Sequence, residues 1–366
     1  MNGVKPLVIF DMDGVLIDVS GSYREVVRRS ILTYLRLVIG APVLPDDAVT
    51  LGDVDAVKKS GGLNNDWDLT YAIIDVVLRR YFDPVNKMHA DRAREIADGG
   101  EDDEETLARV RAMGDRFDVE GVFEGVGQRR VREICAEDRR VRVPAGGPPG
   151  ERAADDELPR RSPFLFNRGD VGSGNLVKRI FQELYLGEEL FRRIYGLKTL
   201  FCAAEGFIGR ERLIPSTRQL ASIASRAALA IATGRPGVEA RFPLDKYGIG
   251  RLFRAVVSED EIAEAESRLG RPLRKPNPFS LELAIARSGF AARCAARRVV
   301  FYVGDMPDDM TAALRAGARA IGFVDESGSS DPGERAFHED LLVKKGAEKV
   351  FGRYTDMLDY LKSKRC

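Results

Sequence analysis

The chain has 366 residues, of which 44% are hydrophobic, so it is long enough for two domains and is neither a fibre nor a wholly disordered chain. Its 57 basic and 57 acidic residues cancel, which removes any bulk charge that would favour nucleic acid or an anionic membrane. The four cysteines are far apart and form no Cys-x-x-Cys pair, so they suit neither a zinc site nor a disulfide scaffold. We expect a cytoplasmic protein with reduced thiols, and the sequence leaves its oligomeric state open.

The first predicted element is a short apolar strand over Leu7–Phe10, which ends at two acids, Asp11 and Asp13. Few residues precede it and no apolar run approaches the length of a membrane span, so we expect no signal peptide and no membrane partner. A buried parallel strand would deliver both acids to its carboxyl end, where open α/β sheets bind ligands. Two carboxylates so close repel each other unless a divalent cation neutralises them or one is used chemically.

Two structural alternatives exist for this Asp-x-Asp-Gly motif. A calcium loop needs Gly at its sixth position and Glu at its twelfth; counted from Asp11 these positions hold Leu16 and Ser22, so this alternative fails. A solvated turn after a strand also contains Asp and Gly, and the motif by itself does not exclude it. The other motifs of the chain decide between a turn and a functional site.

A long segment with a helical pattern follows the first motif. Apolar residues recur with the period of a helix in three stretches, 22–39, 68–81 and 175–195. We therefore predict an α-helical cap over residues 18–215. The cap is inserted into a core formed by residues 1–17 and 216–366.

Within the predicted cap, residues 99–162 differ in composition. The segment is acidic at 101–105, mixes both charges through 138–142 and reads Pro-Ala-Gly-Gly-Pro-Pro-Gly at 144–150. Such a composition buries little apolar surface. Part of the segment, above all 143–161, is therefore predicted to be disordered or a loose loop.

The C-terminal part of the chain alternates strand-like and helix-like stretches. Short runs rich in Val, Ile and Ala, typical of buried strands, lie at 227–232, 253–257, 299–303 and 318–324. Amphipathic stretches such as 279–287 and 310–316 separate them. Together with the first strand they predict an α/β fold with a doubly wound parallel sheet.

Three further motifs follow the first in chain order. Thr233 and Gly234 come after a predicted strand, where a hydroxyl and backbone amides can hold an anion at a helix start. Lys275 lies in a proline-fixed loop ahead of a helix, where it could pair with a phosphate. Asp305 and Asp309 follow another apolar strand and offer the hard oxygen ligands that suit Mg²⁺. Each motif by itself has a structural explanation, but the four in this order favour a functional site.

This set of four motifs resembles the haloacid dehalogenase superfamily, in the subfamily with a helical cap inserted after the first motif. The resemblance covers the chain except for residues 99–162. It implies that Asp11 is the nucleophile that forms an aspartyl-phosphate. It also implies that Asp13 is the general acid that protonates the leaving group and then activates water. Asp13 excludes true haloacid dehalogenation, because members with that activity lack an acid at this place.

The resemblance implies that the second and third motifs bind phosphate, through Thr233, Gly234 and Lys275. This agrees with the chemistry of the reaction. Attack by a carboxylate on a phosphate dianion is opposed by charge repulsion, and Mg²⁺ together with Lys275 offsets it while aligning the nucleophile. Division of the transfer into two steps makes each step easier.

The same resemblance implies a metal site for Mg²⁺ as the cofactor. Its ligands would be the carboxylates of Asp11 and Asp305 and the backbone carbonyl of Asp13. Asp309 matches the acid that supports this site. Asp308 occupies a position that is often Asn, which leaves the division of labour among these acids open.

Three functions are open within this group. A phosphatase and a sugar phosphomutase of the β-phosphoglucomutase type share the core motifs, and only cap residues that guide a bisphosphate intermediate distinguish them. A catalytically idle binding protein ranks third, because a protein that merely binds has no use for the complete set of acids. We predict a Mg²⁺-dependent phosphoric monoester hydrolase that acts on a small phosphorylated metabolite.

Three cap residues are candidates for substrate specificity: Asn65, Trp67 and Arg24. The stretch around Asn65 and Trp67 either faces the substrate or caps a helix with the indole packed beneath, and the sequence leaves both open. Arg24 begins the first cap helix, where it can reach a substrate anion, although an exposed helix face explains it as well. The two histidines, His89 and His338, lie outside every motif and are expected at the surface.

Overall fold

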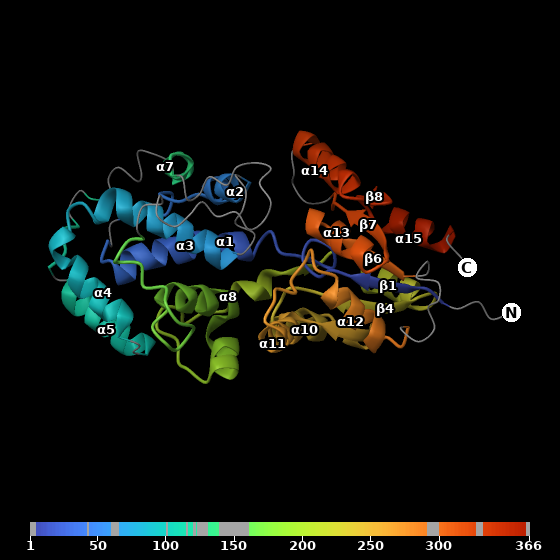
Figure 1. The fold of residues 1–366 in the computed structure, drawn as a ribbon, viewed down its shortest axis with the longest axis horizontal. Coiled ribbons are helices and arrows are strands. Elements are labelled where there is room, and N and C mark those ends of the chain that lie inside the picture. Colours follow the sequence, from blue (N-terminus) through green and yellow to red (C-terminus); the bar gives the residue numbers. More distant parts are fainter. Residues whose placement is uncertain are drawn as a thin grey trace. The chain divides into compact units, whose positions relative to one another are not determined.

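The chain forms two compact units. In the computed structural model, one unit comprises Met1–Ser20 and Glu211–Cys366, and the other Gly21–Arg210. The described residues are 5–41, 44–59, 66–99, 102–114, 116–119, 122, 131–138, 161–290, 300–326 and 332–363. Figure 1 labels many of the elements of each unit, coloured along the sequence. The helical unit is thus inserted into the first unit between Ser20 and Glu211.

The first unit is built on a six-stranded parallel sheet with the strand order β5-β4-β1-β6-β7-β8. Its strands are β1 (Leu7–Phe10), β4 (Ala228–Ala232), β5 (Phe253–Val257), β6 (Val300–Gly304), β7 (Arg319–Phe323) and β8 (Lys349–Phe351). Its helices are α9 (Thr217–Ala224), α10 (Gly237–Lys246), α11 (Glu259–Leu269), α12 (Phe279–Arg287), α13 (Pro307–Arg315), α14 (Pro332–Lys344) and α15 (Tyr354–Ser363), with a short 3₁₀ turn at Gly250–Leu252. The predicted doubly wound α/β fold is confirmed.

Both faces of this sheet are covered by helices, which explains the nearly continuous apolar strands. Successive strand residues point to opposite faces. Val8 and Phe10 therefore pack in a core cluster with residues of α9, α10 and α15. Leu7 and Ile9 pack in a second cluster with residues of α12, α13 and α14. The central strand β1 is buried on both sides, and its carboxyl end lies between those of β4 and β6.

The structure adds strands that the sequence pattern does not predict. The edge strand β8 has only three residues and begins with a lysine, so it lacks the apolar run that marks the other strands. Two residues of β2 (Ile17–Asp18) pair antiparallel with two residues of β3 (Arg212–Leu213). These strands precede and follow the helical unit in the chain. Their pairing joins residues so distant in sequence that no local pattern reveals it.

The second unit is helical. It contains α1 (Tyr23–Thr33), α2 (Leu51–Lys59), α3 (Asp66–Val77), α4 (Ala90–Asp98), α5 (Asp103–Gly114), α7 (Val131–Ala136) and α8 (Leu176–Tyr195). Both α1 and α3 continue into a π-helical turn, at Tyr34–Val38 and Leu78–Phe82, and short 3₁₀ turns lie at Lys87–His89 and Phe207–Arg210. No helix among the described residues is long and apolar enough to cross a membrane.

Parts of the charged segment 99–162 form packed helices in this unit. In α5, three side chains with helical spacing are buried: Leu107, Val110 and Met113. The first residue of α5, Asp103, is buried as well. Residues 139–160 lie outside the described residues. They include all of the stretch 143–161 that is predicted to be disordered except residue 161.

A buried ion network holds α5 to α8. Arg179 donates to Asp103 over 3.0 Å and to Glu183 over 2.5 Å, and all three side chains are at most 2% exposed. The Glu183 carboxylate also accepts backbone N–H bonds from the three residues Leu200, Phe201 and Cys202. Burial of such charges is tolerated only because each of them is paired.

We predict that Glu183→Ala lowers the free energy of unfolding by about 3–5 kcal/mol, because it leaves a buried arginine and several backbone amides short of an acceptor. Urea unfolding followed by circular dichroism measures this. Glu189→Ala, at an exposed position of α8 beyond its kink at Gly187, is the matched control and should change stability by less than about 0.5 kcal/mol. Equal stability of the two variants would contradict the network's proposed contribution.

Candidate active site

Three of the predicted site residues follow three neighbouring strands of the sheet. Asp11 comes directly after β1, Thr233 after β4 and Asp305 after β6. The backbone N–H of Asp11 donates to Val303 O over 2.8 Å, and that of Thr233 donates to Val257 O over 3.0 Å. These bonds continue the sheet ladder past the strand ends, so they fix the backbone where the side chains begin. The strand order reverses direction at β1, which is where such sheets bind ligands.

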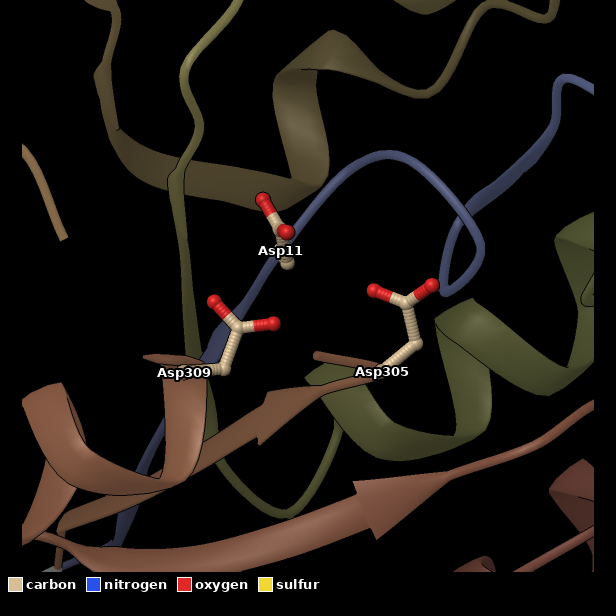
Figure 2. Close-up of side chains that lie close together, drawn as sticks. All are labelled: Asp11, Asp305 and Asp309. Carbon is tan, nitrogen blue, oxygen red and sulfur yellow. The ribbon is translucent and has the colours of Figure 1, made fainter. Parts of the chain in front are cut away.

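Three carboxylates gather at this edge. Asp11, Asp305 and Asp309 each place an oxygen within 4.8 Å of the others (Figure 2). Asp309 lies in the first turn of α13, where its carboxylate accepts the backbone N–H of Met306 over 3.0 Å. Carboxylate oxygens at this spacing are suited to hold a hard divalent cation. The neighbouring Asp308 is not part of this cluster.

The loop after Asp11 approaches Asp305 so closely that only glycine fits. Gly14 has a φ of 69°, and a Cβ added to it would lie 2.2 Å from Asp305 Oδ2. Glycine tolerates a positive φ and leaves the space for this contact. The Asp-x-Asp-Gly motif is therefore explained by two requirements at once: acids at the strand end and a bare backbone beside Asp305.

Lys275 provides the positive charge of the cluster. Its Nζ lies 3.1 Å from Asp11 Oδ1 and 2.8 Å from Asp309 Oδ1. Burial opposes the charge of Lys275, but the charges of Asp11 and Asp309 outweigh burial and hold the pKa of the ammonium well above its usual value. The lysine predicted from the third motif is thus a permanently charged partner of the nucleophile candidate.

The acids outnumber this lysine, and their pKa values reflect the imbalance. Burial raises the pKa of Asp11 to about 7; Lys275 opposes the rise, while Asp309 and Asp13 add to it. Burial, followed by the charges of Asp309 and Asp11, raises the pKa of Asp305 well above its usual value. A bound divalent cation would supply the missing positive charge, so the residues present fit a metal ion.

Asp13 points to a different partner. Its Oδ1 accepts from Nε of Arg235 over 2.5 Å and lies 2.5 Å from Nη2 in an ion pair, and its side chain is 38% exposed. Arg235 is buried and also binds Glu211 over 2.9 and 3.1 Å. The backbone N–H of Arg235 donates to the Thr233 hydroxyl over 3.2 Å, and Gly234 between them is exposed. Sequence reasoning missed the role of Arg235 because an arginine after a turn is usually solvent-exposed.

Two further side chains reach the cluster from the protein interior. The Tyr302 hydroxyl of β6 lies 3.1 Å from Asp309 Oδ1, and burial raises its pKa well above the usual value, so it remains a proton donor. A tyrosine in an otherwise apolar, fully buried strand was the available sequence signal. His338 of α14 is half-buried, and its Nε2 lies 2.7 Å from the carbonyl oxygen of Asp305.

The cap candidates belong to the helical unit. Arg24 is exposed and pairs with Asp55 over 3.1 Å. Trp67 is partly buried: its ring packs edge-to-face on Phe181, and the Lys178 ammonium lies 4.4 Å from its centroid. Asn65 lies outside the described residues. The contacts of Trp67 fit a packing role, and its exposed part leaves it available to a ligand.

The doubly wound sheet thus carries an acidic cluster and a lysine at its carboxyl edge, where such sheets bind ligands. The chain belongs to the haloacid dehalogenase-like hydrolases, because the model of this family matches residues 5–317. None of the curated proteins compared with the chain matches it.

Solved structures with a similar fold include an X-ray structure of a Northeast Structural Genomics Consortium target, with a TM-score of 0.63, 19% identity and coverage of 98% of this chain and 99% of that chain. A phosphatase from Thermococcus thioreducens has a TM-score of 0.47, 18% identity and coverage of 92% and 99%. A putative beta-phosphoglucomutase from Thermotoga maritima has a TM-score of 0.40, 19% identity and coverage of 98% and 99%. At these identities the first of them supports the fold alone.

We predict that Mg²⁺ raises the melting temperature of the protein, because a ligand that binds only the folded state stabilises it by mass action. Asp305→Asn should abolish the shift. Asp308→Asn removes an adjacent acid outside the cluster and should preserve it. Differential scanning fluorimetry with and without Mg²⁺ measures the shift, and equal loss in both variants would contradict a site at the cluster.

The shift should also grow as the pH rises from about 5 to 8. The folded-state pKa of Asp11 is about 7, above its usual 3.8, so its contribution to stability is fully present at low pH and is lost as the pH rises through 7. A metal ion bound at Asp11 would compensate for this lost stability. At high pH fewer protons would compete with the metal for the carboxylate. In Asp11→Asn the pH dependence should flatten.

Proposed function

We propose that this protein is a Mg²⁺-dependent phosphatase that hydrolyses a small phosphorylated metabolite in the cytoplasm through a phosphorylated Asp11. The observation that carries the proposal is the place of Asp11, which lies 3.1 Å from the Lys275 ammonium and belongs to the acidic cluster with Asp305 and Asp309. The separate, free thiols of Cys135 and Cys202 support the location.

The metal would be held by the carboxylates of Asp11 and Asp305 and by the backbone carbonyl of Asp13, with Asp309 in support. Bound there, Mg²⁺ would offset the charge of the phosphate and of the acids. Lys275 contacts Asp11 Oδ1 and would draw a phosphate oxygen toward the nucleophile. The Thr233 hydroxyl and the exposed amide of Gly234 would bind the remaining phosphate oxygens at the start of the following helix.

The reaction proceeds in two displacements. An Asp11 oxygen attacks phosphorus while the bond to the leaving oxygen breaks and Asp13 gives that oxygen its proton. Water then attacks the phosphorus of the aspartyl-phosphate and gives a proton to Asp13, which releases inorganic phosphate and regenerates both acids. Asp13 suits this exchange because its side chain is part-exposed, whereas Asp11 is buried and shielded from water.

We predict that Asp11→Asn lowers phosphate release by more than a hundredfold, because loss of a covalent nucleophile costs several orders of magnitude. The change is nearly isosteric, so the melting temperature should fall little. Phosphate release from a panel of phosphorylated metabolites, with and without Mg²⁺, is the measurement, and Asp308→Asn is the matched control. Activity above about a hundredth of wild type would rule out Asp11 as the nucleophile.

The same panel separates a phosphatase from a phosphomutase. A phosphatase releases inorganic phosphate steadily from a monophosphate without an activator. A mutase needs a bisphosphate or acyl-phosphate to phosphorylate Asp11 first. Isomerisation of a hexose phosphate without net phosphate release would replace the proposed hydrolysis.

We further propose that Trp67, with Arg24 and Asn65, contributes to the choice of substrate. Trp67→Ala should raise KM for the metabolite that is best in the panel and leave p-nitrophenyl phosphate hydrolysis nearly unchanged. Trp67→Phe keeps an aromatic ring against Phe181 and is the packing control. A lowered melting temperature with unchanged selectivity would assign Trp67 to packing alone.

A further inference from the structure

Arg235 connects the two acids Asp13 and Glu211. Its guanidinium is 1% exposed, and so is the Glu211 side chain. One edge of the guanidinium faces Asp13 Oδ1, to which Nε donates and with which Nη2 forms an ion pair, and the two terminal nitrogens donate to the two oxygens of Glu211. Such a planar, two-sided arrangement is specific to arginine, because an ammonium cannot present parallel donors to two carboxylates.

Glu211 is itself fixed to the first unit. Its carbonyl oxygen accepts from Lys246 Nζ over 3.1 Å and from the Tyr247 hydroxyl over 2.7 Å. Arg235 is held at its backbone as well, since its carbonyl oxygen accepts the N–H of Glu259 over 2.8 Å. The guanidinium is therefore immobilised from both ends, and of its two acid partners only Asp13 is substantially exposed.

The contact with Asp13 is one-sided. Arg235 Nε donates to Oδ1 and Nη2 pairs with the same oxygen, while Oδ2 has no hydrogen-bond partner among the residues that the structure describes. A salt bridge that served stability alone would gain from engaging both oxygens of the carboxylate. Arg235 therefore binds Oδ1 of Asp13 and leaves Oδ2 open for proton transfer.

We propose that Arg235, anchored by Glu211, is a positioning residue that fixes the Asp13 carboxyl group so that Oδ2 gives its proton to the leaving oxygen. This inference rests on the proposed phosphatase function. In the first displacement the phosphorus–oxygen bond breaks, the proton on Oδ2 moves to the departing oxygen and Asp13 becomes a carboxylate. Water later returns a proton to the same oxygen. Proton transfer depends steeply on alignment, so a mobile carboxyl group would slow the departure of poor leaving groups most.

Two substrates of nearly equal shape test this. p-Nitrophenol is a much stronger acid than phenol, so p-nitrophenyl phosphate needs little help from a general acid, whereas phenyl phosphate needs much. The constant kcat/KM covers only the steps up to departure of the leaving group, so the later role of Asp13 toward water does not enter it. Arg235→Lys should lower kcat/KM for phenyl phosphate by about a hundredfold and for p-nitrophenyl phosphate by less than about tenfold.

A second pair of variants shows whether the effect passes through Asp13. In the Asp13→Asn background, Arg235→Lys should change the ratio of the two kcat/KM values no further, because the group that it positions is already absent. Arg179→Lys is the matched control. Arg179 is an equally buried arginine that binds two acids in the helical unit, so its replacement should lower the melting temperature and leave the ratio unchanged.

Glu211→Gln keeps the shape of the anchor and removes its charge. It should shift the ratio of the two kcat/KM values in the same direction as Arg235→Lys, by a smaller factor. If Arg235→Lys does not fold, this variant tests the positioning role in its place. Equal losses on both substrates, or a full effect of Arg235→Lys in the Asp13→Asn background, would overturn the positioning role. If Asp11→Asn stays active, the proposed function itself fails. If Asp11→Asn is inactive and the ratio is unmoved in both Arg235→Lys and Glu211→Gln, the positioning role alone fails.

Discussion

The repulsion among the carboxylates around Asp11 is the constraint on which the site depends. A buried acid beside two others is unfavourable unless positive charge reaches it, and Lys275 provides a single ammonium for Asp11 and Asp309 together. Burial, with the charges of Asp309 and Asp13, still raises the pKa of Asp11 against the opposing charge of Lys275. The fold thus places three acids beside one ammonium, and a bound divalent cation would offset the negative charge that remains.

The main features of the fold and part of the site are readable from sequence for a simple reason. Parallel strands share one carboxyl edge, so motifs that follow apolar runs must meet there, whatever their separation in the chain. This places Asp11, Thr233 and Asp305 together without any knowledge of tertiary contacts. The helical periods of α1 and α8 are equally local properties, which is why their positions agree with the pattern.

The side chains that support the acids could not be predicted in this way. Asp13 and Arg235 are 222 residues apart, and His338 meets the Asp305 carbonyl from a helix that carries no motif. Composition fails for a related reason in α5. The acidic composition of this segment predicts that it buries little apolar surface. Asp103 is nevertheless buried, because it forms an ion pair with Arg179 of α8. Whether such a charge can be buried depends on ion pairs between residues far apart in the sequence, which amino-acid composition does not reveal.

The two buried arginines show how the same pairing chemistry serves different ends. Arg179 joins Asp103 and Glu183, which are both buried, and it also donates to the backbone carbonyl of Lys198; all its named contacts hold helices and loops of one unit together. Arg235 joins one buried acid to one that is exposed. Both guanidinium groups are buried, so both need ion pairs to offset the cost of desolvation. Only Arg235 forms one of these ion pairs with a solvent-exposed acid, Asp13. An arginine that is fixed on one edge and turns the other toward an exposed carboxyl group can hold the orientation of that group, which is the role proposed for Arg235 at Asp13.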